Sequence, residues 1–306
     1  ITSDGSIKRC SRKDNSEFFN WTIGGMGLTG IVLRVAFYLH PISTSWIKQK
    51  TIPAKNIEHT MEIFEQNLDS TYSVAWIDCS SRGDKLGRSL VMLGDHASIS
   101  DLSSSMKSNP LTIKNKKKIR ILFNFPSFIL NSIFLKIFNS IYYLLGKRKK
   151  GYKLVDYDTY FYPLDYLLNW NKIYGSKGFA QFQCVLPLKK AKLGMCELLD
   201  AVSASKSISF LTVLKRFGMQ ESYLSFPMEG YTLTLDFPIT KNSIDLMKKL
   251  DEITLKYEGR FYLAKDSRMN NYTLEKSDTR FEKYKKFRSS KMKKSFSSVQ
   301  SERLGL

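Results

Sequence analysis

A succession of strand-like and helix-like segments constrains the fold of this chain more than any other feature of its sequence. Segments in which apolar and polar residues alternate, or in which β-branched and aromatic residues concentrate, predict strands at 71–79, 86–95, 179–187, 208–217 and 231–238. Apolar residues at helical spacing predict helices at 54–68, 188–205 and 241–258. Because several strands follow one another through short connections, we expect an α+β fold with an antiparallel sheet flanked by helices.

The N-terminal region is predicted to add two strands, at 1–10 and 28–39, on either side of a short amphipathic helix that begins at Ser16. Four glycines separate this helix from the second strand: Gly24, Gly25, Gly27 and Gly30. Glycine lets a backbone adopt positive φ and approach a ligand closely. The dinucleotide-binding fingerprint requires the order strand, turn, helix, whereas the order here is helix, turn, strand. By itself, the glycine cluster therefore favours a tight structural turn.

Positive charge is both large and unevenly distributed. The 306 residues include 48 Lys and Arg against 28 Asp and Glu, which gives a formal net charge of +20. No acidic residue lies between Asp101 and Asp156, an interval that holds twelve Lys and Arg, and a second basic cluster lies at 283–294. Such an excess predicts a polyanionic partner, which could be nucleic acid, an anionic membrane surface or a phosphorylated ligand.

The most apolar segment of the chain, residues 123–146, lies inside the acid-free interval. It is long enough to be considered as a membrane span, but Pro126 and the central Lys136 argue against one. At helical spacing its polar residues fall on one stripe, formed by Ser132, Lys136, Asn139, Ser140 and Tyr143. With basic flanks at both ends, this pattern favours a helix in the membrane interface. The alternatives are a buried helical hairpin and a true span.

Cysteine and histidine usage limits metal and disulfide chemistry. The four cysteines are scattered without a C-x-x-C pair, and the three histidines show no ligand spacing. We therefore expect reduced, mostly buried cysteines and no metal site. The aromatic residues beside the basic clusters lie in one continuous apolar run, which argues against a nucleic-acid-binding protein.

Two of the predicted strands carry side chains suited to ligand binding. Gln181 and Gln183 are two residues apart and point to the same face, where their amides can bond sugar hydroxyls. Val213, Lys215 and Phe217 also share a face, so that a cation lies between two apolar side chains. A lysine in such a place is costly unless it meets an anion such as a substrate phosphate. The alternative is an edge lysine that reaches water.

A series of short motifs, in a fixed order and at consistent spacings, extends over essentially the whole chain. The motifs lie at 4–5, 16–19, 24–31, 73–78, 85–88, 162–165, 170–171, 178–183, 209–218, 224–227, 236–238, 259–268 and 303–306. With this set the chain resembles the vanillyl-alcohol-oxidase-type (VAO/PCMH-type) flavoproteins, and within them the oxidases of polyprenyl-phosphate-linked ribose. The resemblance implies FAD as the cofactor.

The resemblance also implies a domain organisation. The C-terminal part of an FAD-binding domain would comprise residues 1–43 and 260–306. A substrate-binding domain would comprise 44–259, with a basic amphipathic insert at about 98–153. The residues that hold the FAD pyrophosphate are expected upstream of Ile1, so the chain would be the C-terminal two-thirds of such an enzyme.

Site residues follow from the same resemblance. It implies Lys265 as the catalytic residue, and substrate contacts from Trp76, Gln181, Gln183, Val213, Lys215, Phe217, Thr232 and Thr234. It implies cofactor contacts from Gly25, Gly27, Gly30, Ile31, Tyr262 and Lys265. A cation at position 265 would stabilise the negative charge that develops as hydride reaches flavin N5. The alternative is a surface ion pair between Lys265 and Asp266.

The remaining expectations concern the edges of the site. Asp236 and Arg268 are expected to orient the site or brace the domain junction. Thr234 and Thr232 stand where the family has a pocket cysteine and a pocket asparagine, which removes thiol chemistry, and Phe161 replaces a pocket tyrosine. Substrate detail is therefore expected to differ from that of the family.

The activity implied is oxidation of a polyprenyl-phosphate-linked ribose at its 2-hydroxyl to a 2-keto sugar lipid, in the synthesis of cell-envelope arabinose precursors. A separate NAD(P)H-dependent keto-reductase would complete the epimerisation. The lipid-linked substrate and the basic insert imply peripheral association with an anionic membrane surface. The alternative within the superfamily is an aldonolactone oxidase, but those enzymes carry a His-Trp-Gly/Ala-Lys run. The corresponding residues here, 262–265, keep the lysine and lack the histidine and the tryptophan.

Overall fold

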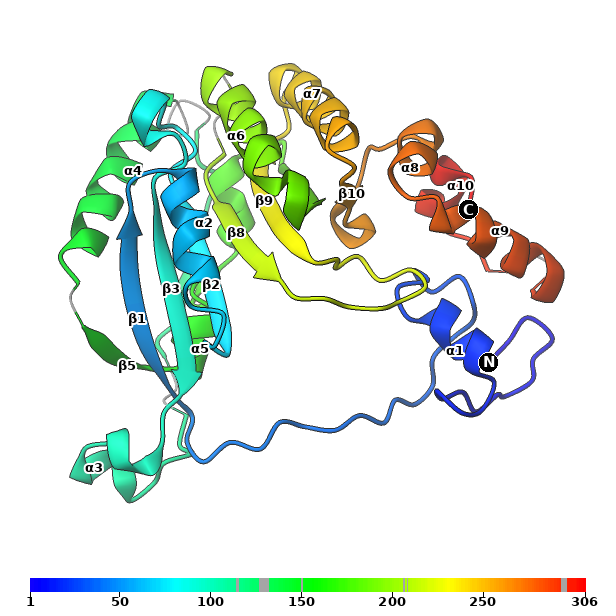
Figure 1. Cartoon of the computed structure of the whole chain (residues 1–306), viewed down its shortest axis with the longest axis horizontal. Helices are drawn as coiled ribbons and strands as arrows, with labels where there is room; N and C mark the ends of the chain where they lie inside the picture. The colour runs from blue at the N-terminus through cyan, green and yellow to red at the C-terminus, as the bar shows by residue number, and fades with distance from the viewer. Residues whose placement is uncertain (114–115, 127–131, 150, 206, 208, 293–295) are drawn as a thin grey trace.

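A computed structural model of the chain describes residues 1–113, 116–126, 132–149, 151–205, 207, 209–292 and 296–306 (Figure 1). Its centre is an antiparallel sheet whose eight strands, within the described residues, follow the order β10-β7-β9-β8-β2-β3-β1-β5. These strands are β1 (Trp46–Ala54), β2 (Tyr72–Ile77), β3 (Ser89–His96), β5 (Tyr152–Asp156), β7 (Phe179–Pro187), β8 (Thr212–Phe217), β9 (Gly230–Pro238) and β10 (Arg260–Phe261). Every pairing in it is antiparallel, which confirms the predicted α+β class.

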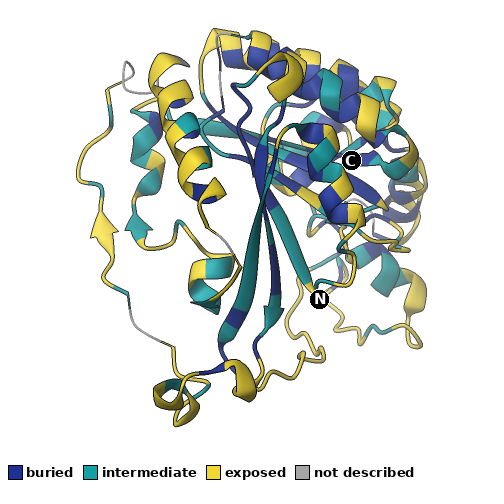
Figure 2. Ribbon diagram, turned by 60° about the vertical axis from the view of Figure 1, so that its left-hand side comes forward, coloured by how far each residue is buried: buried dark blue, intermediate teal, exposed yellow. Residues whose placement is uncertain are grey.

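Three helices cover one face of the sheet: α2 (Ile57–Glu65), α6 (Leu188–Ala204) and α7 (Lys241–Lys256). Asn56 caps the first through the backbone N–H of His59, and Thr240 with Ser243 forms a capping box at the start of the third. Their apolar faces meet alternate strand residues, including Leu214, Leu233 and Leu235, in one buried core (Figure 2). Since side chains alternate along a strand, the intervening residues point to the opposite face.

Helix α4 (Ser132–Lys147) packs against β1 and β3. It lies so close to β3 that a Cβ on Gly146 would clash with Leu90, the register partner of Trp76. Asn139 is buried and its Nδ2 donates to Asp78 Oδ1 at 2.9 Å, while Arg88 Nη2 donates to Ser140 Oγ at 2.9 Å. Residues 127–131 of the apolar segment, and Lys114 and Lys150 of its basic flanks, lie outside the described residues.

Asp78 is the centre of this contact. Its carboxylate is buried, lies 2.7 Å from Arg88 Nη2, and accepts hydrogen bonds from Ser80 and Ser81 as well as from Asn139. Burial alone raises the pKa of Asp78, but these hydrogen bonds outweigh it and hold the pKa below its usual value.

Replacing Asp78 by asparagine is expected to lower the free energy of unfolding by about 3 kcal/mol, because it leaves the Arg88 guanidinium without its counter-charge. The wild-type contribution is present above the unfolded-state pKa and is lost as the pH falls through the depressed folded-state pKa. Urea unfolding of the two proteins at neutral and acid pH measures the difference. A difference that grows on acidification would contradict this account.

The two ends of the chain pack against each other. Helix α1 (Ser16–Thr22) contacts α9 (Arg280–Lys291), which lies with α8 (Asn271–Ser277) and α10 (Val299–Leu304) at the same end of the molecule (Figure 1). Trp21 contacts the rings of Tyr284 and Phe287, and Tyr284 donates to Gly25 O at 2.6 Å. Buried Arg288 donates to Leu28 O and to Phe296 O. The proposed division at 43/44 and 259/260 stays a prediction.

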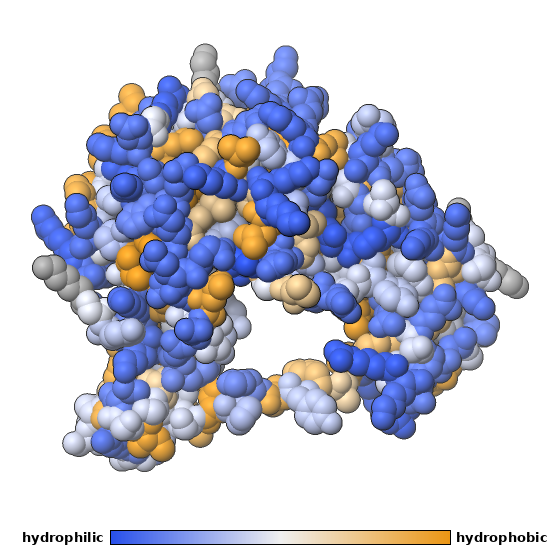
Figure 3. Space-filling view, viewed as in Figure 1, coloured by the Kyte–Doolittle hydropathy of each residue, from blue (hydrophilic) through white to orange (hydrophobic). Residues whose placement is uncertain are grey.

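Two predicted N-terminal strands are wrong. Residues 1–10 form a turn and irregular chain, and residues 28–39 pair with no strand among the described residues. Every residue from 31 to 43 is exposed, and in Figure 3 this linker is a thin strap separated from the sheet by an opening. β-branched composition suits a strand, but a strand forms only where another backbone is available to pair with it.

Short elements complete the described chain. They are η1 (Gly83–Lys85), η2 (Ile99–Asp101), α3 (Ser104–Lys107), β4 (Ile119–Arg120), α5 (Tyr157–Phe161), β6 (Leu167–Leu168), η3 (Trp170–Tyr174) and η4 (Leu263–Lys265). Strands β4 and β6 form a separate parallel pair. No helix in the described part of the chain combines the length and the hydropathy needed to cross a bilayer.

Candidate functional site on the open face of the sheet

Four of the predicted substrate-binding residues form one row across the sheet. Trp76 on β2 is in register with Val213 on β8, which is in register with Thr234 on β9, which is in register with Gln183 on β7. Their strand neighbours belong to the core on the helix-covered side, so the row lies on the opposite face. The structure therefore brings together residues that are far apart in the sequence.

The second row runs parallel to the first. Lys215 on β8 is in register with Thr232 on β9, and Phe217 follows on the same face of β8. Lys215 is exposed, in contrast to the predicted position between apolar walls, so its ammonium group reaches solvent at the edge of the rows. Thr232 is buried, donates to Cys184 O at 2.8 Å and accepts from Gln183 Nε2 at 3.1 Å, which fixes the Gln183 amide.

A buried carboxylate lies beyond these rows. Asp236 on β9 is in register with Gln181 on β7, whose Nε2 donates to Asp236 Oδ1 at 2.8 Å. Asp236 Oδ2 and the Tyr174 hydroxyl are buried near each other without a completed hydrogen bond among the described residues, and the hydroxyl lies close enough to lower the pKa of Asp236. Burial raises the pKa of Asp236 to about 6, opposed by the Gln181 hydrogen bond and by the charge of Lys265.

Tyr174 is a residue that the sequence did not identify. It lies on η3 and is buried, and its ring stacks on the Phe179 ring with their centroids 4.7 Å apart. Its pKa is raised by burial and by the charge of Asp236, which places the two groups within electrostatic reach of each other. Nothing in the local pattern at 170–174 distinguishes this tyrosine from a packing residue, because its polar neighbour comes from β9.

Lys265 lies at the end of η4, a single turn held at both ends. At one end the Tyr262 backbone N–H donates to Gln183 O at 3.0 Å, and the Tyr262 ring stacks on the Phe226 ring with their centroids 4.7 Å apart. At the other end Gln300 Nε2 on α10 donates to Leu263 O at 2.7 Å. The turn is therefore fixed between the sheet and the C-terminal helix.

Asp266 does not pair with Lys265 in the described hydrogen bonds and ion pairs. Its Oδ2 lies 2.9 Å from Arg303 Nη2, and its Oδ1 accepts the backbone N–H groups of Arg268 and Met269. Arg268 in turn makes a two-pronged ion pair with Asp251 on α7, with both distances at 2.6 Å. Arg268 thus braces the segment after η4, and Lys265 lies within electrostatic reach of Asp236.

The glycine turn packs against neighbouring segments of the protein. A Cβ on Gly25 would clash with Trp21 O and lie 2.8 Å from the Tyr284 hydroxyl, and Gly30 with φ +150° abuts the backbone of Ile1. Gly27, with φ +74°, has open space around it, and Ile31 is exposed. The turn thus has a structural role at Gly25 and Gly30, while a cofactor contact at Gly27 or Ile31 stays a prediction.

The residues on this face suit a ligand with hydroxyl groups and polar ring atoms, as the edge of a flavin has. Gln181, Gln183 and Thr234 lie on this face with Lys215 near its edge, and Asp236 Oδ2 and the Tyr174 hydroxyl are buried polar atoms without a completed hydrogen bond in the described chain. A ligand with hydroxyl groups and polar ring atoms supplies such partners. In the described part of the chain no three His, Cys, Asp or Glu residues come close enough to hold a metal ion.

Comparison with known proteins found similarity to an oxidase over nearly the whole chain. The chain is 30% identical over 297 residues to decaprenylphosphoryl-β-D-ribose oxidase of Mycolicibacterium smegmatis, an alignment that covers 95% of this chain and 64% of that protein. The chain is therefore similar to that oxidase. This confirms the resemblance found in the motifs. The chain thus spans a little less than two thirds of the length of this relative.

Other similarities are weaker. An uncharacterized protein of Streptomyces coelicolor, in the mprA 5′ region, is 25% identical over 279 residues, which covers 88% of this chain and 74% of that protein. Among solved structures, a single-residue variant of berberine bridge enzyme aligns with 69% of this chain and 41% of its own, at 16% identity and a TM-score of 0.36. No family model matches the chain.

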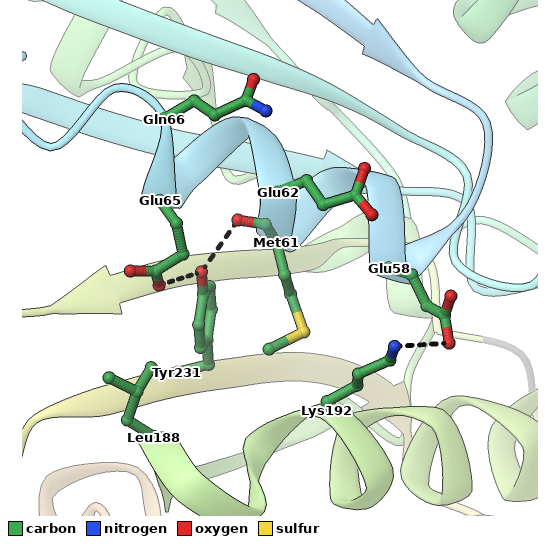
Figure 4. Close-up of a pocket in the computed structure, with 8 residues that line it drawn as sticks. All are labelled: Glu58, Met61, Glu62, Glu65, Gln66, Leu188, Lys192 and Tyr231. Carbon is green, nitrogen blue, oxygen red and sulfur yellow. Dashed lines mark hydrogen bonds and ion pairs between the residues drawn. The ribbon is translucent and has the colours of Figure 1, made fainter.

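A cavity of about 480 Å³ lies on the other side of the sheet, between α2, the start of α6 and β9 (Figure 4). Three glutamates line it, Glu58, Glu62 and Glu65, and the Tyr231 hydroxyl donates to Glu65 at 2.6 Å. An acidic lining repels a phosphate, and the cavity shares no residue with the two rows. It is therefore a separate feature from the candidate site.

Proposed function

We propose that this chain belongs to an FAD-dependent oxidoreductase that oxidises a polyprenyl-phosphate-linked ribose at its 2-hydroxyl to a 2-keto sugar lipid. The observation that carries the proposal is the meeting of Trp76, Val213, Thr234 and Gln183 in one row, with the turn that carries Lys265 hydrogen-bonded to Gln183 O through the Tyr262 N–H. The relation to an oxidase named for decaprenylphosphoryl-β-D-ribose supports the substrate class. FAD, when bound, supplies the acceptor for the hydride that leaves the ribose carbon.

Different side chains on this face would bind different parts of the substrate. Gln183 and Gln181 already donate one N–H each, to Thr232 and Asp236, so their carbonyl oxygens are oriented to accept sugar hydroxyls. Lys215, exposed at the end of the second row, is suited to the phosphate. Trp76, which is 7% exposed beside Tyr142, provides apolar surface at the α4 end of the row.

Lys265 acts at the reacting carbon. Its ammonium group can donate a hydrogen bond to the 2-hydroxyl oxygen and stabilise the negative charge that forms there as the hydroxyl proton passes to solvent, while the hydride on C2 leaves for the bound FAD. A separate NAD(P)H-dependent keto-reductase would then reduce the 2-keto product. The rival within the superfamily, an aldonolactone oxidase, would need a substrate without a phosphate, for which an exposed Lys215 has no role.

The substrate class is tested with protein expressed from its full open reading frame. Under anaerobic conditions, polyprenyl-phosphoryl ribose is expected to bleach the flavin absorbance, and an aldonolactone is not. Bleaching by the lactone and not by the lipid would overturn the proposal. A protein that purifies without a flavin spectrum, even after incubation with FAD, would overturn the cofactor assignment.

A further inference from the structure

Helix α4 presents its apolar face outward and its polar stripe inward. Ile133, Ile137, Ile141 and Leu144 are 53–69% exposed, while Asn139 is 2% exposed. At 100° per residue these four apolar side chains share one side of the helix, opposite Leu135 and Asn139. A helix at the surface of a water-soluble protein has the reverse orientation.

The inward orientation is fixed by three polar contacts. Asn139 donates to Asp78, Arg88 donates to Ser140, and the Tyr143 hydroxyl donates to Ala54 O at 3.2 Å. Rotating the helix to bury its apolar face would break these contacts and leave the buried Asp78 carboxylate with fewer partners. These contacts therefore require the apolar face to be exposed. Among Lys136, Asn139, Ser140 and Tyr143 of the predicted polar stripe, Lys136 differs from the others because it is exposed.

Charge around α4 indicates what covers this face. Lys136, Lys147, Arg148 and Lys149 are all exposed on or just after the helix, and the chain has no acidic residue from 102 to 155. Further exposed cations, Lys117, Lys118 and Arg120, and the exposed Leu122 and Phe123 lie on the segment that precedes it. An apolar face framed by cations complements the acyl boundary and headgroups of an anionic bilayer.

We propose that the outward face of α4, formed by Ile133, Ile137, Ile141 and Leu144, docks the protein on an anionic phospholipid bilayer. The apolar side chains enter the acyl boundary, and the basic residues at the end of the helix contact the headgroups. The same helix reaches the candidate site, because Tyr142 lies edge-on to Trp76 with ring centroids 4.7 Å apart. A lipid-borne substrate would therefore meet the site next to the docked helix.

The proposal does not depend on the reaction, so its test measures binding alone. The full-length protein is mixed with vesicles of phosphatidylcholine, with or without phosphatidylglycerol, and the bound fraction is measured by flotation. Wild type is expected to bind the vesicles that contain phosphatidylglycerol and to dissociate at high salt. The double variant Ile137→Glu, Ile141→Glu is expected to bind at least about tenfold more weakly, because it places two charges in the acyl boundary.

A matched control places a charge on an exposed apolar residue elsewhere. Leu68 is 60% exposed, and Leu68→Glu is expected to bind like wild type. Unchanged binding by the α4 double variant with wild-type thermal stability would overturn the proposal. So would equal binding to neutral and anionic vesicles. A wild-type dimer that the double variant converts to a monomer, without vesicle binding by either, would assign the face to a second copy of the chain instead.

Discussion

Replacing Lys265 by alanine is expected to slow reduction of the flavin by polyprenyl-phosphoryl ribose by about 10²- to 10³-fold, the usual cost of losing one preorganised group that stabilises developing charge. The backbone around it should not change, because η4 is held by Gln183 O and Gln300, and Asp266 is held by Arg303. Flavin content and thermal stability should therefore stay at wild-type values. Stopped-flow absorbance under anaerobic conditions measures the rate.

Two further lysine variants serve as a comparison and a control for Lys265→Ala. Lys215→Ala is expected to raise the substrate concentration needed for half-maximal rate while leaving the maximal rate nearly unchanged, because Lys215 is proposed to contact the phosphate and not the reacting carbon. Lys248→Ala, at an exposed position on α7, is the neutral control. If Lys265→Ala reduced the flavin at the wild-type rate, Lys265 would have no part in the reaction.

Asp236→Asn is expected to make the protein more stable and less active. A buried carboxyl with a raised folded-state pKa binds its proton more tightly than the unfolded chain does. Wild-type stability therefore falls as the pH rises from the ordinary value of 3.8 to about 6. This rise in the pKa of Asp236 lowers the free energy of unfolding above pH 6 by about 3 kcal/mol. Asp236→Asn is expected to restore that amount. The difference in free energy of unfolding between the two proteins, measured by urea titration at several pH values, isolates this residue.

Asp236→Asn should lower the rate of flavin reduction although it raises stability. Asparagine keeps an oxygen for the Gln181 amide but removes the negative charge that acts on Lys265. In wild type, flavin reduction is expected to increase with pH through a limb near pH 6 as Asp236 ionises, and Asp236→Asn should lack that limb. A purely structural Asp236 would change stability and leave the pH profile unaltered. Retention of the limb in Asp236→Asn would exclude Asp236 as a positioning residue.

Much of the sheet could be predicted from local patterns, and the failures have physical causes. β7 and β9 are central strands with clear alternation, and their bounds agree closely with prediction. β1 was missed because its residues are mostly half-buried and include Pro53, and β5 because it is a short edge strand within the basic interval. Residues 28–39 have the composition of a strand but no partner in the described chain.

In the site, too, the sequence predicted which residues share a face of a strand but not which strands lie side by side. Alternation predicted that Gln181 and Gln183 share a face, but only the register of four strands shows that Gln183 meets Thr234, Val213 and Trp76. The α4 pattern defined a polar stripe without saying which side faces the protein. That choice depends on Asp78, a buried carboxylate from a distant part of the sequence that pairs with Asn139.

The central claim is that the protein oxidises the ribose of its substrate at the 2-position, at the candidate site. Isotopic substitution of the substrate tests this claim most directly. Polyprenyl-phosphoryl ribose carrying deuterium at C2 should reduce the flavin of the full-length protein more slowly than the unlabelled compound, because the C2–H bond breaks in the measured step. Deuterium at C3 should leave the rate unchanged. A rate slowed by the C3 label and unaffected by the C2 label would contradict the account.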